Sequence, residues 1–152
     1  MNMIKEGDKA PTFNLESTSG EKISLEDFEG ETVVLYFYPK DDTPGCTREA
    51  CDFRDNYFDY LDKGAVILGI SPDSRESHEN FSDKYSLPFP LLVDKDHKVS
   101  EQYGVWVEKN TYGKKSWGIQ RSTFIIGPDG IIKKAFAKVN VEGHAEEVMA
   151  AL

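Results

Sequence analysis

The chain has 152 residues, of which 39% are apolar and 30% are charged, and its formal net charge is −9. This is the length of one ordinary domain, so we expect a single domain over residues 1–152 whose core needs neither a disulfide nor a metal. The acidic balance argues against nucleic acid and against an anionic membrane surface as partners.

Short apolar runs alternate with turn residues along the whole chain. In chain order, the pattern predicts a hairpin at 13–15 and 22–24, a helical turn from 24 to 30, a strand at 32–38, a helix at 46–63, a strand at 65–71, a helix capped by Ser74, a strand at 91–93, a helix at 99–103, strands at 123–126 and 131–137, and a helix at 141–152. The run at 32–38 (TVVLYFY) is continuous and β-rich, which is typical of a strand buried on both faces. In the first long helix, Ala50, Phe53, Tyr57 and Leu61 share one face.

This order of elements predicts an α/β fold of the thioredoxin-like type, with a mixed central sheet flanked by helices on both faces and an N-terminal hairpin extension. The turn at 127–130 (GPDG) supports the last hairpin because proline fixes φ and glycine supplies a positive φ. Trp106 and Trp117 bracket a polar segment, 108–116, which we expect to be a loop with both tryptophans in the core or at a pocket rim.

No targeting or membrane-spanning segment is expected. The first residues (MNMIKEGDKAPTF) lack the apolar centre of a signal peptide, and the longest apolar run, 33–38, is far too short to span a bilayer. We therefore expect a cytoplasmic protein. In that compartment a disulfide is more often transient and catalytic than structural.

The chain has two cysteines, Cys46 and Cys51. Cys46 follows a Pro-Gly turn at the start of the predicted helix, where the helix dipole and free N–H groups favour an ionised thiol. Cys51 lies five residues further along the same helix. The pair therefore suits redox chemistry, provided that a cation offsets the nearby acidic side chains of Asp41, Asp42 and Glu49.

Three arginines are candidates for that cation. Arg48 and Arg54 are local, but Arg48 is expected to face solvent. Arg121 precedes the predicted strand at 123–126, which in a thioredoxin-like sheet lies beside the strand that leads into the cysteine loop.

Other interpretations of the cysteines remain open at this point. Both could be inert apolar side chains, and Cys51 suits that role better because it flanks the buried face of its helix. A metal site is disfavoured because His78, His97 and His144 are scattered without ligand spacing and are expected on surfaces or helix faces. Five-residue spacing is also not the C-x-x-C of dithiol exchange proteins.

The stretch FYPKDDTPGCTREAC contains Pro39, Thr43 and Cys46 in the pattern Pro-x-x-x-Thr-x-x-Cys. This pattern resembles the active-site signature of the peroxiredoxins. The position of Cys51 is similar to that of the resolving cysteine in the bacterioferritin comigratory protein, or Q-type, subfamily. The resemblance extends over nearly the whole chain, through GDKAPTFNL, GISPDS and RSTFIIGPDG, the last of which begins at Arg121.

The resemblance implies a thioredoxin-dependent peroxidase of the atypical two-cysteine kind, acting on hydrogen peroxide and organic hydroperoxides. Cys46 becomes a sulfenic acid, condenses with Cys51 to an intramolecular disulfide, and is recycled by a thioredoxin-type protein. No metal, haem, flavin or other cofactor is implied, and the subfamily suggests a monomer. Two alternatives are a non-catalytic redox-sensing or chaperone-like module and a general thiol–disulfide oxidoreductase.

The resemblance also assigns roles to the residues around Cys46. Thr43 offers its hydroxyl to the thiolate and the peroxide, Pro39 shields the pocket, and Arg121 stabilises both the thiolate and the breaking O–O bond. Glu49 either orients an arginine or is an ordinary acid of a first helical turn.

The spacing of the cysteines has a mechanical consequence. Five residues along an α-helix separate two Cα atoms by roughly 9 Å, whereas a disulfide needs less than about 7 Å. The start of the helix must therefore unwind before Cys46 and Cys51 can join.

Overall fold

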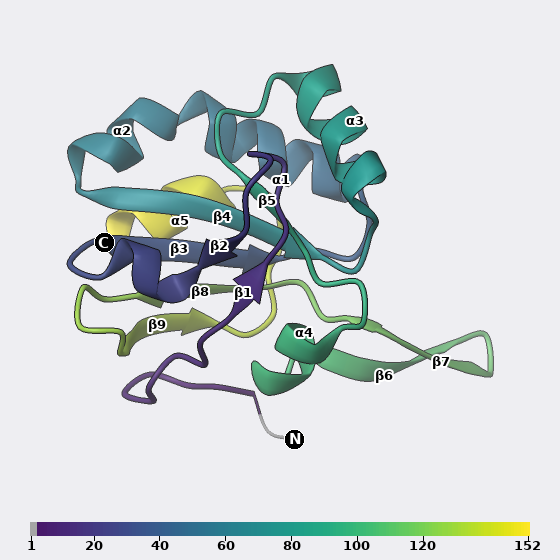
Figure 1. Cartoon of the computed structure of the whole chain (residues 1–152). Helices are drawn as coiled ribbons and strands as arrows, with labels where there is room; N and C mark the ends of the chain where they lie inside the picture. The colour runs from purple at the N-terminus through teal and green to yellow at the C-terminus, as the bar shows by residue number, and fades with distance from the viewer. Residues whose placement is uncertain (1–2) are drawn as a thin grey trace.

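The computed structural model describes residues 3–152 and has a five-stranded mixed sheet at its centre (Figure 1). Its strands, in spatial order, are Leu91–Val93 (β5), Ala65–Ser71 (β4), Thr32–Phe37 (β3), Ser122–Ile126 (β8) and Ile132–Phe136 (β9). β3, β4 and β5 are parallel, while β8 is antiparallel to β3 and β9 is antiparallel to β8. The apolar run at 32–38 is thus the central strand, as its composition predicts.

Helices cover both faces of the sheet unevenly. The helices are Leu25–Phe28 (η1, a 3₁₀-helix), Pro44–Asp55 (α1), Tyr57–Asp62 (α2), Arg75–Tyr85 (α3), Lys98–Gln102 (α4) and His144–Ala150 (α5). Val34 and Tyr36 of β3 pack toward buried side chains of α1, α2, α3 and α5. Val33, Leu35 and Phe37 face the opposite core, which η1, α4 and the N-terminal segment complete. Because successive side chains of a strand point to opposite faces, alternate residues of β3 belong to two different hydrophobic cores.

Most of the predicted elements are confirmed. Asn14–Leu15 (β1) pairs with Ile23–Ser24 (β2) as the expected N-terminal hairpin, and β4 has the predicted bounds. Ser74 caps α3, because its Oγ accepts a hydrogen bond of 3.2 Å from the backbone N–H of Ser77. The thioredoxin-like arrangement with its mixed central sheet is therefore the observed fold.

The predicted helix at 46–63 is wrong as a single element. It breaks at Asn56, whose side-chain amide donates to the carbonyl of Asp52 at 2.8 Å, and α2 then begins at Tyr57. The break changes which residues face inward. Leu61 is 40% exposed, whereas Tyr60 is fully buried and donates from its hydroxyl to the carbonyl of Ala145.

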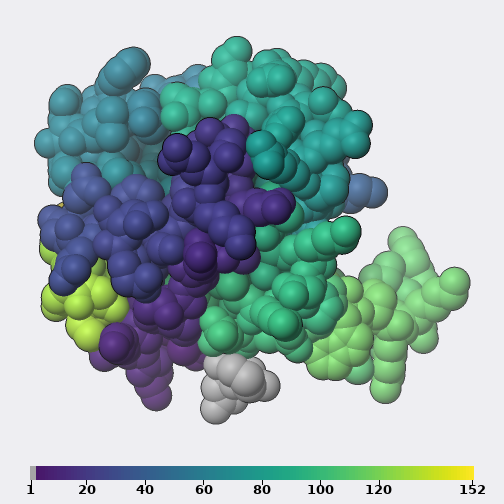
Figure 2. Space-filling model, viewed as in Figure 1, coloured from purple at the N-terminus to yellow at the C-terminus, as the bar shows by residue number. Residues whose placement is uncertain are grey.

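The expected polar loop at 108–116 is instead a hairpin of Trp106–Thr111 (β6) and Lys114–Ile119 (β7). Tyr112 and Gly113 join the strands with φ of 52° and 80°, the backbone of a two-residue hairpin turn. The hairpin projects from the body of the molecule (Figures 1 and 2). Trp117 is consequently 58% exposed rather than part of the core, while Trp106 is half-buried and stacks on His97.

The histidines also differ from expectation. His78 and His144 do lie on helix faces, as one of the two expected placements had it, but they are at most 1% exposed, so the surface placement is wrong for both. His78 shares its face of α3 with buried Phe81, and His144 bonds Thr123 through Nε2. Within residues 3–152, none of the helices combines the length and the apolar character that crossing a bilayer requires.

Candidate active site

Cys46 lies in the first turn of α1, directly beyond the loop that follows β3. Thr43 is the residue before the helix and has an extended backbone, and Pro44 occupies the first helical position, where a missing N–H costs nothing. The N–H of Cys46 is among the first four of the helix, which have no intrahelical acceptor. The thiol is free and 1% exposed. The sequence therefore places a buried sulfur at the positive end of a helix.

Arg121 is the cation that contacts this sulfur. β3 and β8 pair with Phe37 opposite Ser122, so Arg121 lies at the same edge of the sheet as the cysteine loop. Its Nη2 donates to Cys46 Sγ at 3.3 Å. A Cβ atom at Gly45 would lie 3.1 Å from that Nη2, which explains why the residue before the cysteine has no side chain.

The two local arginines are engaged elsewhere. Arg48 is exposed and lies 3.9 Å from the carboxylate of Asp52. Arg54 donates from Nη1 to the carbonyl of Tyr85 at 2.7 Å and pairs with Asp55. Of the three candidates, Arg121 is thus the one that hydrogen-bonds Cys46, and the strand pairing inferred from the sequence is confirmed.

Glu49 holds Arg121 in position. Arg121 Nη1 donates to Glu49 Oε1 at 2.7 Å, and the glutamate side chain is 1% exposed. Of the two interpretations left open by the sequence, the geometry therefore supports an acid that orients an arginine. Burial raises the pKa of Glu49 to about 7, although Arg121 acts to lower it, and among residues 3–152 Oε2 has no hydrogen-bond partner.

The charges around Arg121 favour its cationic form. Burial acts to lower the pKa of Arg121, but Glu49 and Cys46 outweigh it, so the pKa lies above its usual value. Lys109 of β6 is a further neighbour of Arg121 that no sequence pattern predicts, since β6 lacks a regular apolar alternation. Burial, and after it the positive charge of Arg121, lowers the pKa of Lys109. The projecting hairpin therefore begins beside the active site.

Thr43 and Pro39 lie in the loop before Cys46. The hydroxyl of Thr43 donates to the carbonyl of Lys40 at 2.9 Å, so its proton is directed back into the loop. Its oxygen lone pairs stay free to accept a hydrogen bond from a peroxide O–H. Pro39 is half-buried and follows Tyr38 at the end of β3.

Cys51 has a different environment on the same helix. It is a free, half-buried thiol, and burial raises its pKa, with Arg54 opposing the rise and Asp55 and Asp52 adding to it. The pair therefore consists of one thiol that contacts a guanidinium and one that is held neutral. Because α1 is continuous from Pro44 to Asp55, the predicted need for unwinding applies to the observed structure.

Comparison with known proteins agrees with this site. The sequence matches the AhpC/TSA family over residues 6–135. It is 54% identical over 149 residues to the putative peroxiredoxin bcp of Coxiella burnetii, covering 98% of this chain and 99% of that protein. It is 49% identical over 149 residues to peroxiredoxin Bcp of Bacillus subtilis, covering 98% of this chain and 95% of that protein.

Solved structures give the same result. Peroxiredoxin Q of Xanthomonas campestris aligns with a TM-score of 0.89 at 42% identity, covering 98% of this chain and 94% of that one. BcpB of Mycobacterium tuberculosis aligns with a TM-score of 0.86 at 32% identity, covering 97% of this chain and 96% of that one. The chain therefore belongs to the AhpC/TSA family and, within it, to the Bcp/PrxQ peroxiredoxins, which makes it a thiol-dependent peroxidase.

Proposed function

We propose that this peroxidase reduces hydrogen peroxide and organic hydroperoxides at Cys46, resolves the oxidised cysteine with Cys51, and is recycled by a thioredoxin-type dithiol protein. The observation that carries the proposal is the 3.3 Å contact between Arg121 Nη2 and Cys46 Sγ at the start of a helix. A guanidinium and a helix N-terminus both favour the thiolate, which is the nucleophilic form of cysteine.

In the first step, the Cys46 thiolate attacks the terminal oxygen of the peroxide. An S–O bond forms, the O–O bond breaks, and the other oxygen leaves as water or an alcohol after taking up a proton. Arg121 stabilises the negative charge that develops on the breaking bond. Thr43 accepts a hydrogen bond from the peroxide, and Pro39 limits the access of water to the sulfur.

In the second step, Cys51 attacks the sulfenic sulfur of Cys46. An S–S bond forms and the hydroxyl of the sulfenic acid leaves as water. The first turns of α1 open to allow this, because oxidation removes the negative charge to which Arg121 donates. A reduced thioredoxin-type protein then exchanges its two thiols for the disulfide.

The proposal includes a substrate class, an oligomeric state and a cellular compartment. Organic hydroperoxides are included because a solved Xanthomonas campestris bacterioferritin comigratory protein, 42% identical to this chain, is described in connection with alkyl peroxide reduction. We further propose that the enzyme acts as a monomer in the cytoplasm, where reductants keep thiols free.

The consumption of NADPH in the presence of thioredoxin and thioredoxin reductase, measured peroxide by peroxide, tests this function. Sustained consumption with hydrogen peroxide and with an alkyl hydroperoxide is expected. A single oxidation without turnover would favour a redox sensor. Reaction with protein disulfides but not with peroxides would favour a general oxidoreductase.

A further inference from the structure

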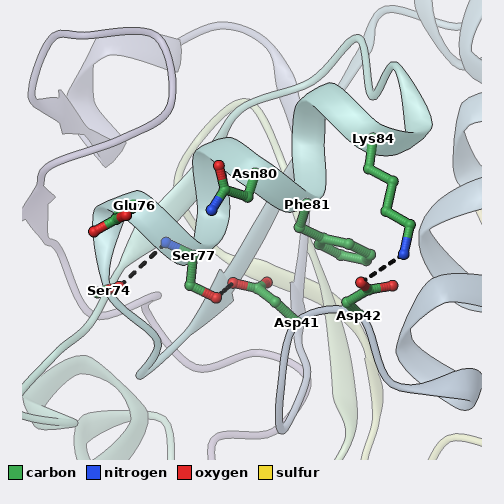
Figure 3. A pocket seen from close by; sticks show the side chains of 8 residues that line it. All are labelled: Asp41, Asp42, Ser74, Glu76, Ser77, Asn80, Phe81 and Lys84. Atoms are coloured by element: carbon green, nitrogen blue, oxygen red, sulfur yellow. Dashed lines mark hydrogen bonds and ion pairs between the residues drawn. The ribbon is translucent and has the colours of Figure 1, made fainter.

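The loop between β3 and α1 is bonded to α3 along its length. A groove of about 360 Å³ lies between them, and polar and charged side chains line most of it. Figure 3 shows Asp41 and Asp42 on the loop side, with Ser77 of α3 directed at Asp41 and Lys84 directed at Asp42. Neither Cys46 nor Arg121 lines this groove, so it is separate from the site described above.

Asp41 is the most heavily bonded residue of the loop. Its carboxylate receives hydrogen bonds from the hydroxyl of Tyr38 at 2.6 Å, the hydroxyl of Ser77 at 2.7 Å and Nδ1 of His78 at 2.6 Å. The side chains of Asp41 and His78 are 3% and 0% exposed. Three hydrogen bonds therefore hold this one buried carboxyl group in place.

The geometry also fixes the protons of His78. Its Nε2 lies 2.8 Å from the carbonyl oxygen of Leu92, and a carbonyl can only accept, so Nε2 carries a hydrogen. Its Nδ1 lies 2.6 Å from Asp41 Oδ2, a distance that two lone pairs cannot share, so a second hydrogen lies between them. The buried Asp41 and His78 side chains therefore share a proton, and both ring nitrogens of His78 are hydrogen-bonded.

The backbone of Asp41 is fixed as well. Its N–H donates to Asp73 Oδ2 at 2.7 Å, and Ser71 at the end of β4 donates to the same oxygen at 3.0 Å. Ligand-type atoms of Asp41, Asp73 and His78 lie within 4.8 Å of one another, but they are occupied by these hydrogen bonds. The cluster is thus a closed network rather than a cation site.

We propose that Asp41 and His78 are positioning residues that anchor the catalytic loop, holding residues 38–41 in place in both redox states while the first turns of α1 open. This inference rests on the peroxidase cycle proposed above. The link to the reacting atoms is short, since Thr43 Oγ1 donates to the carbonyl of Lys40, the residue next to Asp41. The moving segment then begins beyond Asp42, whose backbone has a φ of 57°.

Two backbone amides on either side of that boundary provide the test. The N–H of Asp41 bonds Asp73, and the N–H of Thr47 bonds the carbonyl of Thr43 at 2.8 Å. Amide exchange is measured by NMR on the reduced wild-type protein and on its disulfide form made with diamide, a thiol oxidant. In the disulfide form, Thr47 should lose its protection, whereas Asp41 should keep it, together with the ring Nε2–H signal of His78. Loss of protection at Asp41 to the same extent as at Thr47 would overturn the proposal.

A variant tests the link to catalysis. His78→Gln can replace one of the two hydrogen bonds made by the ring nitrogens but not both, so Asp41 amide protection and the rate of Cys46 oxidation by peroxide should each fall at least about tenfold in folded protein. Lys84→Gln is the matched control from the same groove, because it removes an exposed ion pair, and it should change both by less than about twofold. An unchanged oxidation rate in folded His78→Gln would overturn the proposal.

A second variant covers the case in which His78→Gln does not fold, and the choice of oxidant separates this proposal from the proposed peroxidase function. If His78→Gln does not fold, Ser77→Ala removes one of the three donors to Asp41 and should lower Asp41 protection several-fold, about the effect of one hydrogen bond. Unchanged protection there would count against the anchor. Because diamide makes the disulfide, a wild-type protein that failed to reduce peroxide would refute the proposed function while leaving the amide test intact.

Discussion

The two halves of α1 are held by different interactions. The first half is fixed by polar contacts, since Arg121 bonds both Cys46 and Glu49. The second half is fixed by packing, with the ring of Phe53 4.9 Å from that of Tyr36 and Ala50 fully buried. Oxidation of the sulfur weakens the polar contacts directly, whereas exposing each apolar side chain costs roughly 1.5–3 kcal/mol. The helix is therefore built to open from its start and to stop near Phe53.

The largest loss of activity is expected when the sulfur of Cys46, in the first half of α1, is removed. Cys46→Ser should abolish peroxide reduction, because serine offers no accessible anion at neutral pH. The measurement is peroxide consumption with a saturating reductant. Turnover that survives in this variant would mean that the reactive thiol lies elsewhere.

Removing the sulfur of Cys51, in the second half of α1, should separate the oxidation of Cys46 from the formation of the disulfide. Cys51→Ser should still consume about one equivalent of peroxide and stop at a sulfenic acid on Cys46, while turnover with thioredoxin collapses. Sulfenic acid trapping with a dimedone probe, alongside the coupled assay, checks both parts. Normal turnover would make Cys51 an apolar core residue of a one-cysteine enzyme.

The polar contact itself is tested at Arg121. Arg121→Met should slow Cys46 oxidation by about 10²-fold or more, because the thiolate and the breaking bond both lose a positive charge. Arg48→Met is the matched control on α1 and should have little effect, since the Arg48 side chain is 58% exposed and pairs with the surface carboxylate of Asp52. The reverse result would mean that the observed contact with Cys46 does not serve catalysis.

Opening the first half of α1 in the disulfide form should also lower the free energy of unfolding. The disulfide closes a loop of only about six residues, so its entropic gain is small, while opening α1 loses hydrogen bonds and packing near Ala50. We expect the disulfide form to unfold with a free energy lower by about 1–3 kcal/mol. Urea denaturation of both redox states measures this, and an equal or greater stability after oxidation would contradict the comparison.

The smallest expected effect is the contribution of Glu49 to the pH dependence of stability. The folded-state pKa of about 7 lies above the ordinary value of 4.5, so the folded protein binds more protons between these values. Stability should therefore fall as pH rises from 4.5 to 7, at most by about 1.4 kcal/mol per pH unit from this group. Glu49→Gln should remove that part of the slope, which denaturation of both proteins across this range measures. Parallel slopes in the two proteins would show that Glu49 is ionised throughout.

The sequence predicts the contact at Cys46 well because that contact follows from strand order. A continuous run of β-branched and aromatic residues is typical of a strand buried on both faces, and pairing the 123–126 strand beside it brings Arg121 to the cysteine. The contact between His78 and Asp41 was not predicted, because the two residues lie 37 positions apart and no local pattern links them. The spacing of His78 to Phe81, one helical turn away, was the available signal that its side chain is buried.

The hairpin at β6 and β7 was missed for a different reason. Its strands are mostly exposed and lack the alternation that marks a half-buried strand, so they resemble a loop. The turn at Tyr112 and Gly113 was the remaining local indication. The break at Asn56 is likewise invisible to periodicity, because it depends on one side chain that bonds the preceding turn.

In the proposed cycle, Cys46 and Cys51 join within one chain after a single reaction with peroxide. Treatment of the reduced protein with one equivalent of hydrogen peroxide, followed by proteolysis and mass spectrometry without reduction, tests it most directly. We expect one intrachain Cys46–Cys51 link, no free thiol and no cross-linked dimer. Two thiols that remain free, or a link between two chains, would contradict it.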